Sequence, residues 1–146
     1  MLSYNATIGS KHSPETVFDY LANFANAAEW DPGIVEANLV TPEPIQFGSR
    51  FELVSTIAGR RVKLTYQLLT FDRPNVFVVR AEGSGFVSED TISFKPEGEG
   101  TIVHYNANLI LLGVGRVFTP VWKIVFNRIG SRAAKSLAKW LNREAL

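Results

Sequence analysis

Polar and apolar side chains alternate through the middle of the chain. Between residues 34 and 111 apolar residues recur at every second position, and turn-forming segments with Gly or Pro interrupt them at 73–75, 83–85 and 98–100. Successive side chains of a β-strand point to opposite faces, so this period predicts antiparallel strands with one dry and one solvated face. A shorter alternation over 3–8 predicts another strand at the start.

Two short helices are expected after this first strand. Ser13 offers a hydroxyl for the N-cap, and Pro14 suits the first helical position. Apolar residues then recur at helical spacing as far as Phe24. A second helical segment is expected to end at Trp30, because Pro and Gly at 31–33 stop a helix.

Helical spacing returns over 114–146, which predicts one long terminal helix. At about 1.5 Å per residue it would be roughly 45 Å long if unbroken, so it must cross most of the sheet. The start of this segment, up to Phe126, is apolar almost all round, which predicts burial on two sides or an exposed patch. A basic stripe follows on a neighbouring face, formed by Arg128, Arg132, Lys135, Lys139 and Arg143.

This order of elements is that of the helix-grip fold, and four segments resemble the polyketide cyclase/dehydrase group of START-like (SRPBCC) proteins. They are SPETVFDYL at 13–21, EWDPG at 29–33, DTISFKP at 90–96 and the hairpin strand that ends at Tyr105. The terminal helix, around 132–141, is also similar. The resemblance covers nearly the whole chain and specifies fold rather than chemistry.

The resemblance implies one α+β domain over residues 1–146. A curved, seven-stranded antiparallel sheet would wrap around the long C-terminal helix, with two short helices after the first strand. Members of this superfamily bind lipids or other hydrophobic small molecules between the sheet and the last helix. A minority carry out cyclisation, dehydration or hydrolysis.

Composition narrows the classes of function. With 146 residues, 46% hydrophobic content and a net charge of +1, the chain can form one ordered core and is not expected to be disordered. The absence of cysteine excludes disulfides, thiolate metal sites and cysteine nucleophiles. The longest apolar stretch, 109–126, contains two basic residues and is a poor membrane span. Because no signal-peptide pattern opens the sequence, we expect a cytoplasmic protein.

The near-zero total hides a division of charge, since residues 1–110 carry −5 and residues 111–146 carry +6. The basic stripe suits a solvated face near a helix C-terminus. Alternatively, the stripe attracts an anionic membrane surface or an acidic partner. A homodimer that forms through the last helix is a further interpretation. Specific nucleic-acid binding is not expected, because no aromatic residues lie between the basic ones.

The usual catalytic motifs are missing. His12 and His104 are distant in sequence and have no carboxylate cluster at ligand spacing, so neither a metal nor another cofactor is expected. No Gly-x-Ser-x-Gly motif is present. Gly-Ser-Gly at 83–85 lacks the lysine and helix of a phosphate-binding loop and is interpreted as a turn or bulge.

Asp90 is the most reactive candidate, because alternation places it on the dry face of its strand. Burial there would raise its pKa and suit acid–base catalysis. Two alternatives remain: water reaches Asp90 at the strand end, or a bulge near Gly85 turns Glu89 inward instead. Tyr66 and Tyr105 are the candidate hydroxyl partners.

Large inward-facing side chains can line a pocket or fill it. Trp30, beside the loop at 31–33, can gate the mouth of a pocket or act as a plug. The candidate ligand-binding residues are Trp30, Phe51, Leu53, Leu64, Tyr66, Leu68, Phe77, Val79, Ile92, Phe94, Tyr105, Phe118, Trp122 and Phe126.

The resemblance and these residues together suggest three functions. The first is binding or transport of a hydrophobic small molecule, such as a lipid, a fatty acid or a polyketide-like aromatic. The second is a metal-free cyclase or dehydrase in which Asp90 removes a proton from an acidic C–H and Tyr66 or Tyr105 donates to the enolate oxygen. The third is a protein- or membrane-interaction module that uses the apolar segment 114–126.

Overall fold

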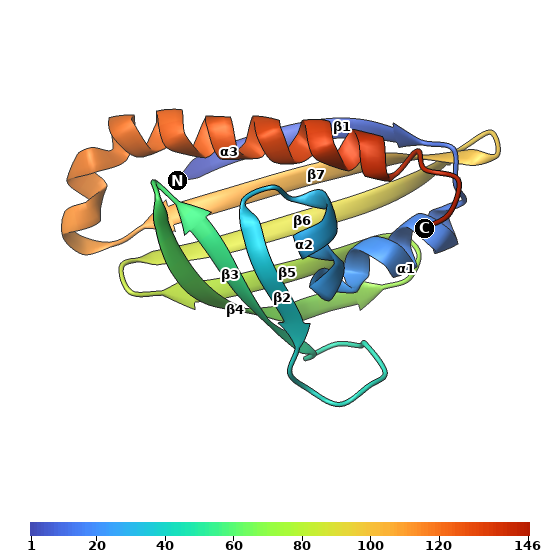
Figure 1. The fold of residues 1–146 in the computed structure, drawn as a ribbon, viewed down its shortest axis with the longest axis horizontal. Helices are drawn as coiled ribbons and strands as arrows, with labels where there is room; N and C mark the ends of the chain where they lie inside the picture. The colour runs from blue at the N-terminus through green and yellow to red at the C-terminus, as the bar shows by residue number, and fades with distance from the viewer.

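The computed structural model contains one curved sheet of seven antiparallel strands (Figure 1). It describes residues 1–113 and 116–146. The strand order is β1-β7-β6-β5-β4-β3-β2. The strands are β1 (Leu2–Ser10), β2 (Ile34–Leu39), β3 (Arg50–Ile57), β4 (Arg60–Asp72), β5 (Val76–Gly83), β6 (Phe86–Glu97) and β7 (Gly100–Leu111).

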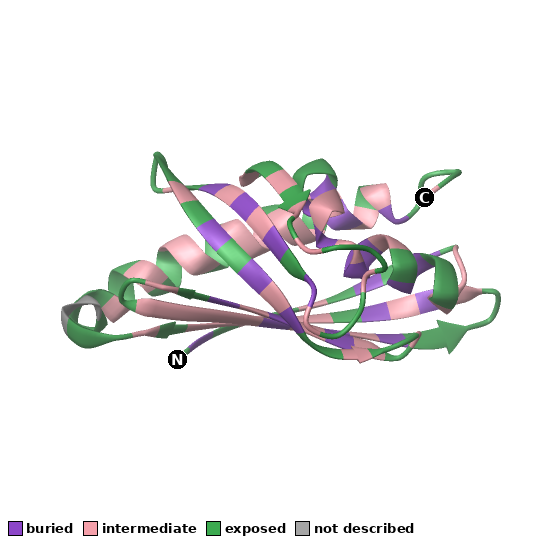
Figure 2. Ribbon diagram, turned by 90° about the horizontal axis from the view of Figure 1, so that it is seen from below, coloured by how far each residue is buried: buried purple, intermediate pink, exposed green. Residues whose placement is uncertain are grey.

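Helices lie on one side of this sheet (Figures 1 and 2). They are α1 (Pro14–Ala22), the 3-10 turn η1 (Phe24–Asn26), α2 (Ala27–Trp30), the 3-10 turn η2 (Gly113–Phe118) and α3 (Thr119–Trp140). As predicted, Ser13 caps α1, and its hydroxyl accepts a hydrogen bond from the Thr16 backbone N–H. The arrangement confirms the helix-grip fold.

The terminal helix is shorter than predicted. The expectation of one helix over 114–146 is wrong in length, since α3 has 22 residues and is about 33 Å long. The helix ends at Trp140. After this end, the side-chain amide of Asn142 donates hydrogen bonds to the free carbonyl of Ala138 in the last turn and to the carbonyl of Gly9 in β1. The chain then continues along the end of β1, where the Ser10 hydroxyl donates to Leu141 O at 2.6 Å. Val114, the first residue of the predicted helix, lies outside the described residues.

The concave face of the sheet is solid at one end, which we call the filled end. There α1 inserts Phe18, whose ring lies edge-on to Phe71, Phe77 and Phe94 at centroid distances of 5.3, 5.7 and 5.3 Å. Phe24 of η1 packs in the same way on Phe51 at 6.3 Å. These rings bury large apolar areas, and Figure 2 shows buried residues where α1 faces the sheet.

Seven of the residues predicted to contact a ligand lie in this solid packing instead. Sequence alternation placed them on the correct face, but it could not show that α1 and η1 cover that part of the face. They are Phe51, Leu53, Leu68, Phe77, Val79, Ile92 and Phe94, all 4% exposed or less.

The other end of the concave face, which we call the hollow end, is covered by α3. This helix lies along β1 and approaches it closely (Figure 1). A Cβ atom added to Gly130 would lie 2.5 Å from Tyr4 Cγ, so only glycine allows this approach without a shift.

Strand register decides which acidic residue faces inward. The β5–β6 pairing runs without a bulge from Gly83↔Phe86 to Val76↔Ser93, and Asp90 pairs with Val79. Gly85 forms the turn with a φ of +87° and does not shift the strand that follows. Asp90 is therefore buried at 7% exposure, and the alternative with Glu89 inward is wrong. Glu89 instead pairs with Arg80 at 3.3 Å on the outer face.

Candidate ligand-binding site

A cavity of about 700 Å³ occupies the hollow end, between α3 and the sheet. Its wall is formed by β1, β2, β3, β4, β6, β7, α2 and α3, together with the loop after α2 and two hairpin turns. Most of the lining side chains are aliphatic or aromatic. Seven predicted site residues belong to this wall: Trp30, Leu64, Tyr66, Asp90, Tyr105, Trp122 and Phe126.

The helical wall comes from one stripe of α3. Trp122, Phe126 and Ile129 lie three or four residues apart, so they share one side of the helix. Farther along the helix the stripe becomes small at Gly130, Ala133 and Ala134, which also line the cavity. Large side chains there would fill the space, so these small residues are a direct cause of the cavity.

Phe118, which was predicted to lie on the same stripe, does not line this cavity. It belongs to η2, directly before α3, and its side chain is 60% exposed. The 3-10 turn breaks the helical phase that the prediction extended through this segment.

Sequence reasoning missed part of the wall. Tyr4, Ala6 and Ile8 of β1 and Ala107 and Leu109 of β7 face the cavity at every second position. The same alternation that identified the other strands would have found them. Asp31 was also missed as a lining residue, because it was interpreted only as part of a helix stop.

Asp90 and Tyr105 form a buried hydrogen-bonded pair in the wall. The Tyr105 hydroxyl donates to Asp90 Oδ2 at 2.6 Å. Burial is the main cause that raises the pKa of Asp90 to about 7, whereas the hydrogen bond from Tyr105 opposes this rise. Burial also raises the pKa of Tyr105 and keeps its phenol protonated. The pair can therefore accept or release a proton near neutral pH.

Tyr66 contributes a second phenol to the same wall. Its hydroxyl lies 3.4 Å from Ser88 Oγ, and burial raises its pKa. The charge of Asp90 raises the pKa of Tyr66 further.

Asp31 and Trp30 lie in the wall next to α2. Burial raises the pKa of Asp31, while the Gly33 backbone N–H donates to Asp31 Oδ1 at 2.9 Å and opposes the rise. The ring of Trp30 meets that of Tyr105 edge-on, at 6.0 Å between centroids. Trp30 is only 2% exposed, and within the described residues its indole N–H has no hydrogen-bond partner.

The open side of the cavity is bordered by two hairpin turns and the end of β7. Ala58 comes from the β3–β4 turn, Arg60 begins β4, Ser84 and Gly85 form the β5–β6 turn, and Leu112 follows β7. Both turns contain left-handed residues, which are Ala58, Gly59 and Gly85. The side chain of Arg60 is exposed there.

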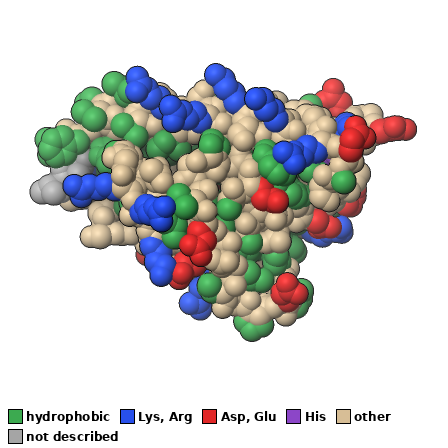
Figure 3. All heavy atoms as spheres, in the orientation of Figure 1, with side chains coloured by type: hydrophobic (Ala, Val, Ile, Leu, Met, Phe, Trp, Pro, Cys, Tyr) green, Lys and Arg blue, Asp and Glu red, His purple; other side chains and the backbone are tan. Residues whose placement is uncertain are grey.

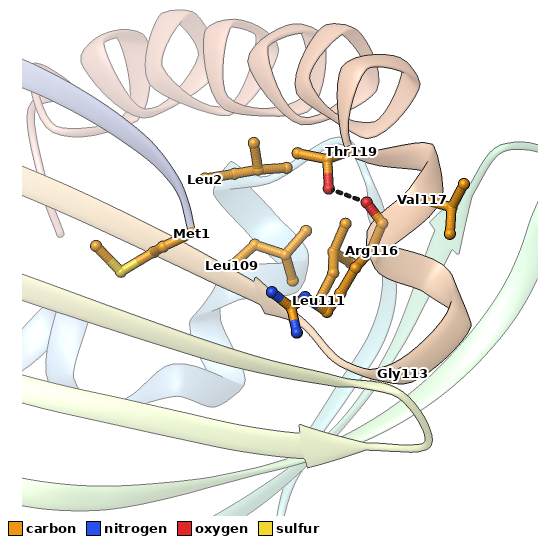
Figure 4. Close-up of a pocket in the computed structure, with 8 residues that line it drawn as sticks. All are labelled: Met1, Leu2, Leu109, Leu111, Gly113, Arg116, Val117 and Thr119. Atoms are coloured by element: carbon orange, nitrogen blue, oxygen red, sulfur yellow. Dashed lines mark hydrogen bonds between the residues drawn. The ribbon is translucent and has the colours of Figure 1, made fainter.

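A second pocket of about 520 Å³ lies where β1 begins and η2 leads into α3 (Figure 4). It is more open, and it shares Leu109 and Leu111 with the larger cavity. The Thr119 hydroxyl donates to Arg116 O at 2.6 Å across one side of it. Because this pocket contains neither an aromatic ring nor a carboxyl group, we assign the candidate site to the larger cavity.

Across 1–113 and 116–146, no three His, Cys, Asp or Glu side chains gather to hold a metal ion. His104 is exposed, and its Nδ1 lies 3.2 Å from Thr7 Oγ1 on the outer face of β7. No helix in these same ranges is long and apolar enough to cross a membrane.

The sheet, the covering helix and the cavity define a START-like domain. Residues 1–141 match the family model described as "Polyketide cyclase / dehydrase and lipid transport", and the chain belongs to this family. No curated protein matches the sequence significantly.

Solved structures support the same fold. A START superfamily protein from Mycobacterium smegmatis aligns with a TM-score of 0.79 and 16% identity, over 95% of this chain and 96% of that one. TTHA0849 from Thermus thermophilus aligns with a TM-score of 0.78 and 19% identity, over 95% and 96%. The Zhui aromatase/cyclase from a Streptomyces species aligns with a TM-score of 0.77 and 13% identity, over 95% and 92%. At these identities the likeness concerns the fold.

Proposed function

We propose that the protein binds a hydrophobic small molecule in the cavity, such as a lipid or a polyketide-like aromatic. The observation that carries this proposal is a space of about 700 Å³ with a mostly apolar wall. Each Å² of apolar ligand surface removed from water contributes roughly 25 cal/mol, so such a wall binds apolar molecules without special chemistry. The cysteine-free sequence fits a carrier that works in the cytoplasm.

The test fills the cavity and compares binding. Ala133 lines it from α3, so Ala133→Trp places an indole in the space. Lys135→Trp puts the same side chain on an exposed position of the same helix and is the matched control. We expect native mass spectrometry of the wild type and the control, purified from their own source, to show an apolar adduct that Ala133→Trp lacks.

The outcome that contradicts binding is equally definite. If no adduct is found, and a panel of fatty acids, alcohols and aromatics leaves the melting temperature of the wild type unchanged, the cavity does not serve as a ligand site. Equal binding by Ala133→Trp and by the wild type would place the ligand elsewhere.

A second candidate function is catalysis of cyclisation or dehydration. It is favoured by Asp90, whose pKa of about 7 suits a general base, and by the phenols of Tyr105 and Tyr66 nearby. Asp90 would remove a proton from an acidic C–H, and a phenol would donate to the enolate oxygen that develops.

A bound aromatic 1,3-diketone tests this chemistry by its exchange of C–H for C–D in deuterated water. The wild type should accelerate the exchange, and Asp90→Asn should lose the acceleration while it retains affinity for the diketone. Equal acceleration by both proteins would remove Asp90 from any such mechanism.

A third candidate is contact with an anionic membrane through the start of α3. Val117, Phe118, Val121 and Ile124 form an apolar patch, each 60% exposed or more. Basic side chains follow along α3, so apolar insertion and attraction to anionic lipid would act on the same face (Figure 3).

Liposome sedimentation distinguishes this contact from self-association. More of the wild-type protein should sediment with phosphatidylglycerol vesicles than with phosphatidylcholine vesicles. Val121→Glu should lower the fraction that sediments with phosphatidylglycerol vesicles. A concentration-dependent dimer in analytical ultracentrifugation, without vesicle binding, would instead assign the patch to a second copy of the chain.

A further inference from the structure

The charged side chains in the cavity wall are unequally placed. Among the lining residues, only Asp31, Arg60 and Asp90 carry ionisable acidic or basic side chains. Arg60 lies at the open side, at the start of β4, and is exposed. The two carboxyl groups lie in the inner wall, and the charge of Asp31 contributes to the raised pKa of Asp90.

No basic side chain compensates these carboxyl groups within the described residues. Every ion pair in 1–113 and 116–146 involves other acids, and none includes Asp31 or Asp90. The stretch of α3 that covers the cavity contributes Trp122, Phe126, Ile129, Gly130, Ala133, Ala134 and Leu137. The other titratable groups in the wall come from β1, β4 and β7 and are the phenols of Tyr4, Tyr66 and Tyr105.

Aromatic rings surround this acidic part of the wall. Trp30 and Tyr105 pack edge-on at 6.0 Å, and the ring of Tyr66 lines the same cavity. A carboxylate beside several aromatic faces attracts an ammonium group both by its charge and through cation–π contact. A ligand carboxylate in the same place would be repelled by two acids without a nearby cation.

We propose that the ligand is a lipophilic amine whose protonated nitrogen binds at Asp90, beside Asp31, Trp30 and Tyr105. Its apolar part occupies the aliphatic space under α3. This inference rests on the proposed binding function and restricts its ligand class, because it disfavours fatty acids with the head group inside.

Three probes with the same ten-carbon alkyl chain test the inference: decylamine, decanol and decanoate. Each is kept below its aggregation concentration and is titrated into the protein by calorimetry at pH 7.5. We expect decylamine to bind at least about tenfold more tightly than decanol, and we expect decanoate to bind most weakly. Decanoate binding should depend on Arg60, so Arg60→Gln should weaken it and leave decylamine unaffected.

Substitutions in the wall give the sharper result. Asp90→Asn should weaken decylamine at least about tenfold and leave decanol within about twofold. Glu89→Gln, one residue away on the outer face of β6, is the matched control and should change neither. Decylamine affinity of the wild type should rise between pH 6 and pH 8, as Asp90 ionises, and Asp90→Asn should abolish the rise.

The outcomes separate this inference from the function on which it rests. If decanol or decanoate binds as tightly as decylamine, or if Asp90→Asn binds decylamine normally, the amine assignment is overturned and apolar binding stands. If none of the three probes binds, the proposed binding function fails and the amine assignment fails with it. Thermal unfolding of each variant checks that a loss of binding is not a loss of fold.

Discussion

The filled and hollow ends belong to the same face of the same sheet, yet one is core and the other is cavity. At the filled end, α1 brings Phe18 down onto three further phenylalanine rings. At the hollow end, α3 presents Gly130, Ala133 and Ala134 to the sheet. The comparison teaches that the strands supply an apolar face throughout, and the size of the helical side chains decides where that face is left open.

The largest effect is expected from Phe18→Ala, which would open a new void at the filled end. Phe18 is fully buried, so the substitution should lower the free energy of unfolding by about 3–5 kcal/mol. Urea unfolding monitored by circular dichroism measures this change. A loss below about 1 kcal/mol would show that the filled end is loosely packed, and the contrast between the ends would disappear.

The second prediction concerns Asp90 and pH. Because its folded-state pKa of about 7 exceeds the ordinary aspartate value of 3.8, the folded protein binds the proton more strongly than the unfolded chain does. Its contribution to stability is therefore present below about pH 4 and is lost as the pH rises toward and through 7.

Asp90→Asn should remove this loss of stability. Between pH 4 and pH 8 the free energy of unfolding of the variant should therefore rise by a few kcal/mol relative to that of the wild type. Urea unfolding of both proteins across that range measures the difference. A constant difference would show that Asp90 is not buried as a carboxyl group in the wall.

The third prediction makes the same substitution at both ends. Ala22 is 2% exposed within the filled end, so Ala22→Leu should overpack it and cost about 1–3 kcal/mol. Ala133 faces the cavity, and Ala133→Leu should change stability by less than about 1 kcal/mol because the added atoms enter open space. Equal costs in thermal denaturation would contradict the assigned difference.

A fourth prediction is that Phe126→Ala has a much smaller effect on stability than Phe18→Ala. Phe126 lines the cavity and is only partly packed against protein atoms, so its loss should cost about 1 kcal/mol. Ligand affinity should fall at the same time, because the ring would no longer contact the bound molecule. A cost as large as that of Phe18→Ala would mean that the hollow end is part of the core.

The fold could be predicted because alternation and helix signals specify the type of each element locally. Asp90 was placed inward correctly, since no irregularity separates it from the turn at Gly85. Phe77 and Phe94 face inward as predicted, but they pack under α1 and do not line the cavity. A period of two identifies the face of a strand, but not the helix that covers each part of it.

The helical wall shows the same limit. Trp122 and Phe126 follow the helical stripe, whereas Phe118 precedes the first turn of α3 and loses that phase. Ala133 and Gly130 carry no strong sequence signal, because a small residue on a helix is equally compatible with close packing and with empty space. Only the arrangement of α3 over β1 distinguishes these two cases.

The contact between Gly130 and Tyr4 makes the capacity of the cavity adjustable at a single position. A methyl group at residue 130 cannot be accommodated unless Tyr4 rotates or α3 moves away from β1, and either response reshapes a wall that includes both residues. Substitutions there would alter the length and width of the cavity, while the acid and phenol of Asp90 and Tyr105 stay in place. The shape of the space can thus be changed from the helix without a substitution at Asp90 or Tyr105.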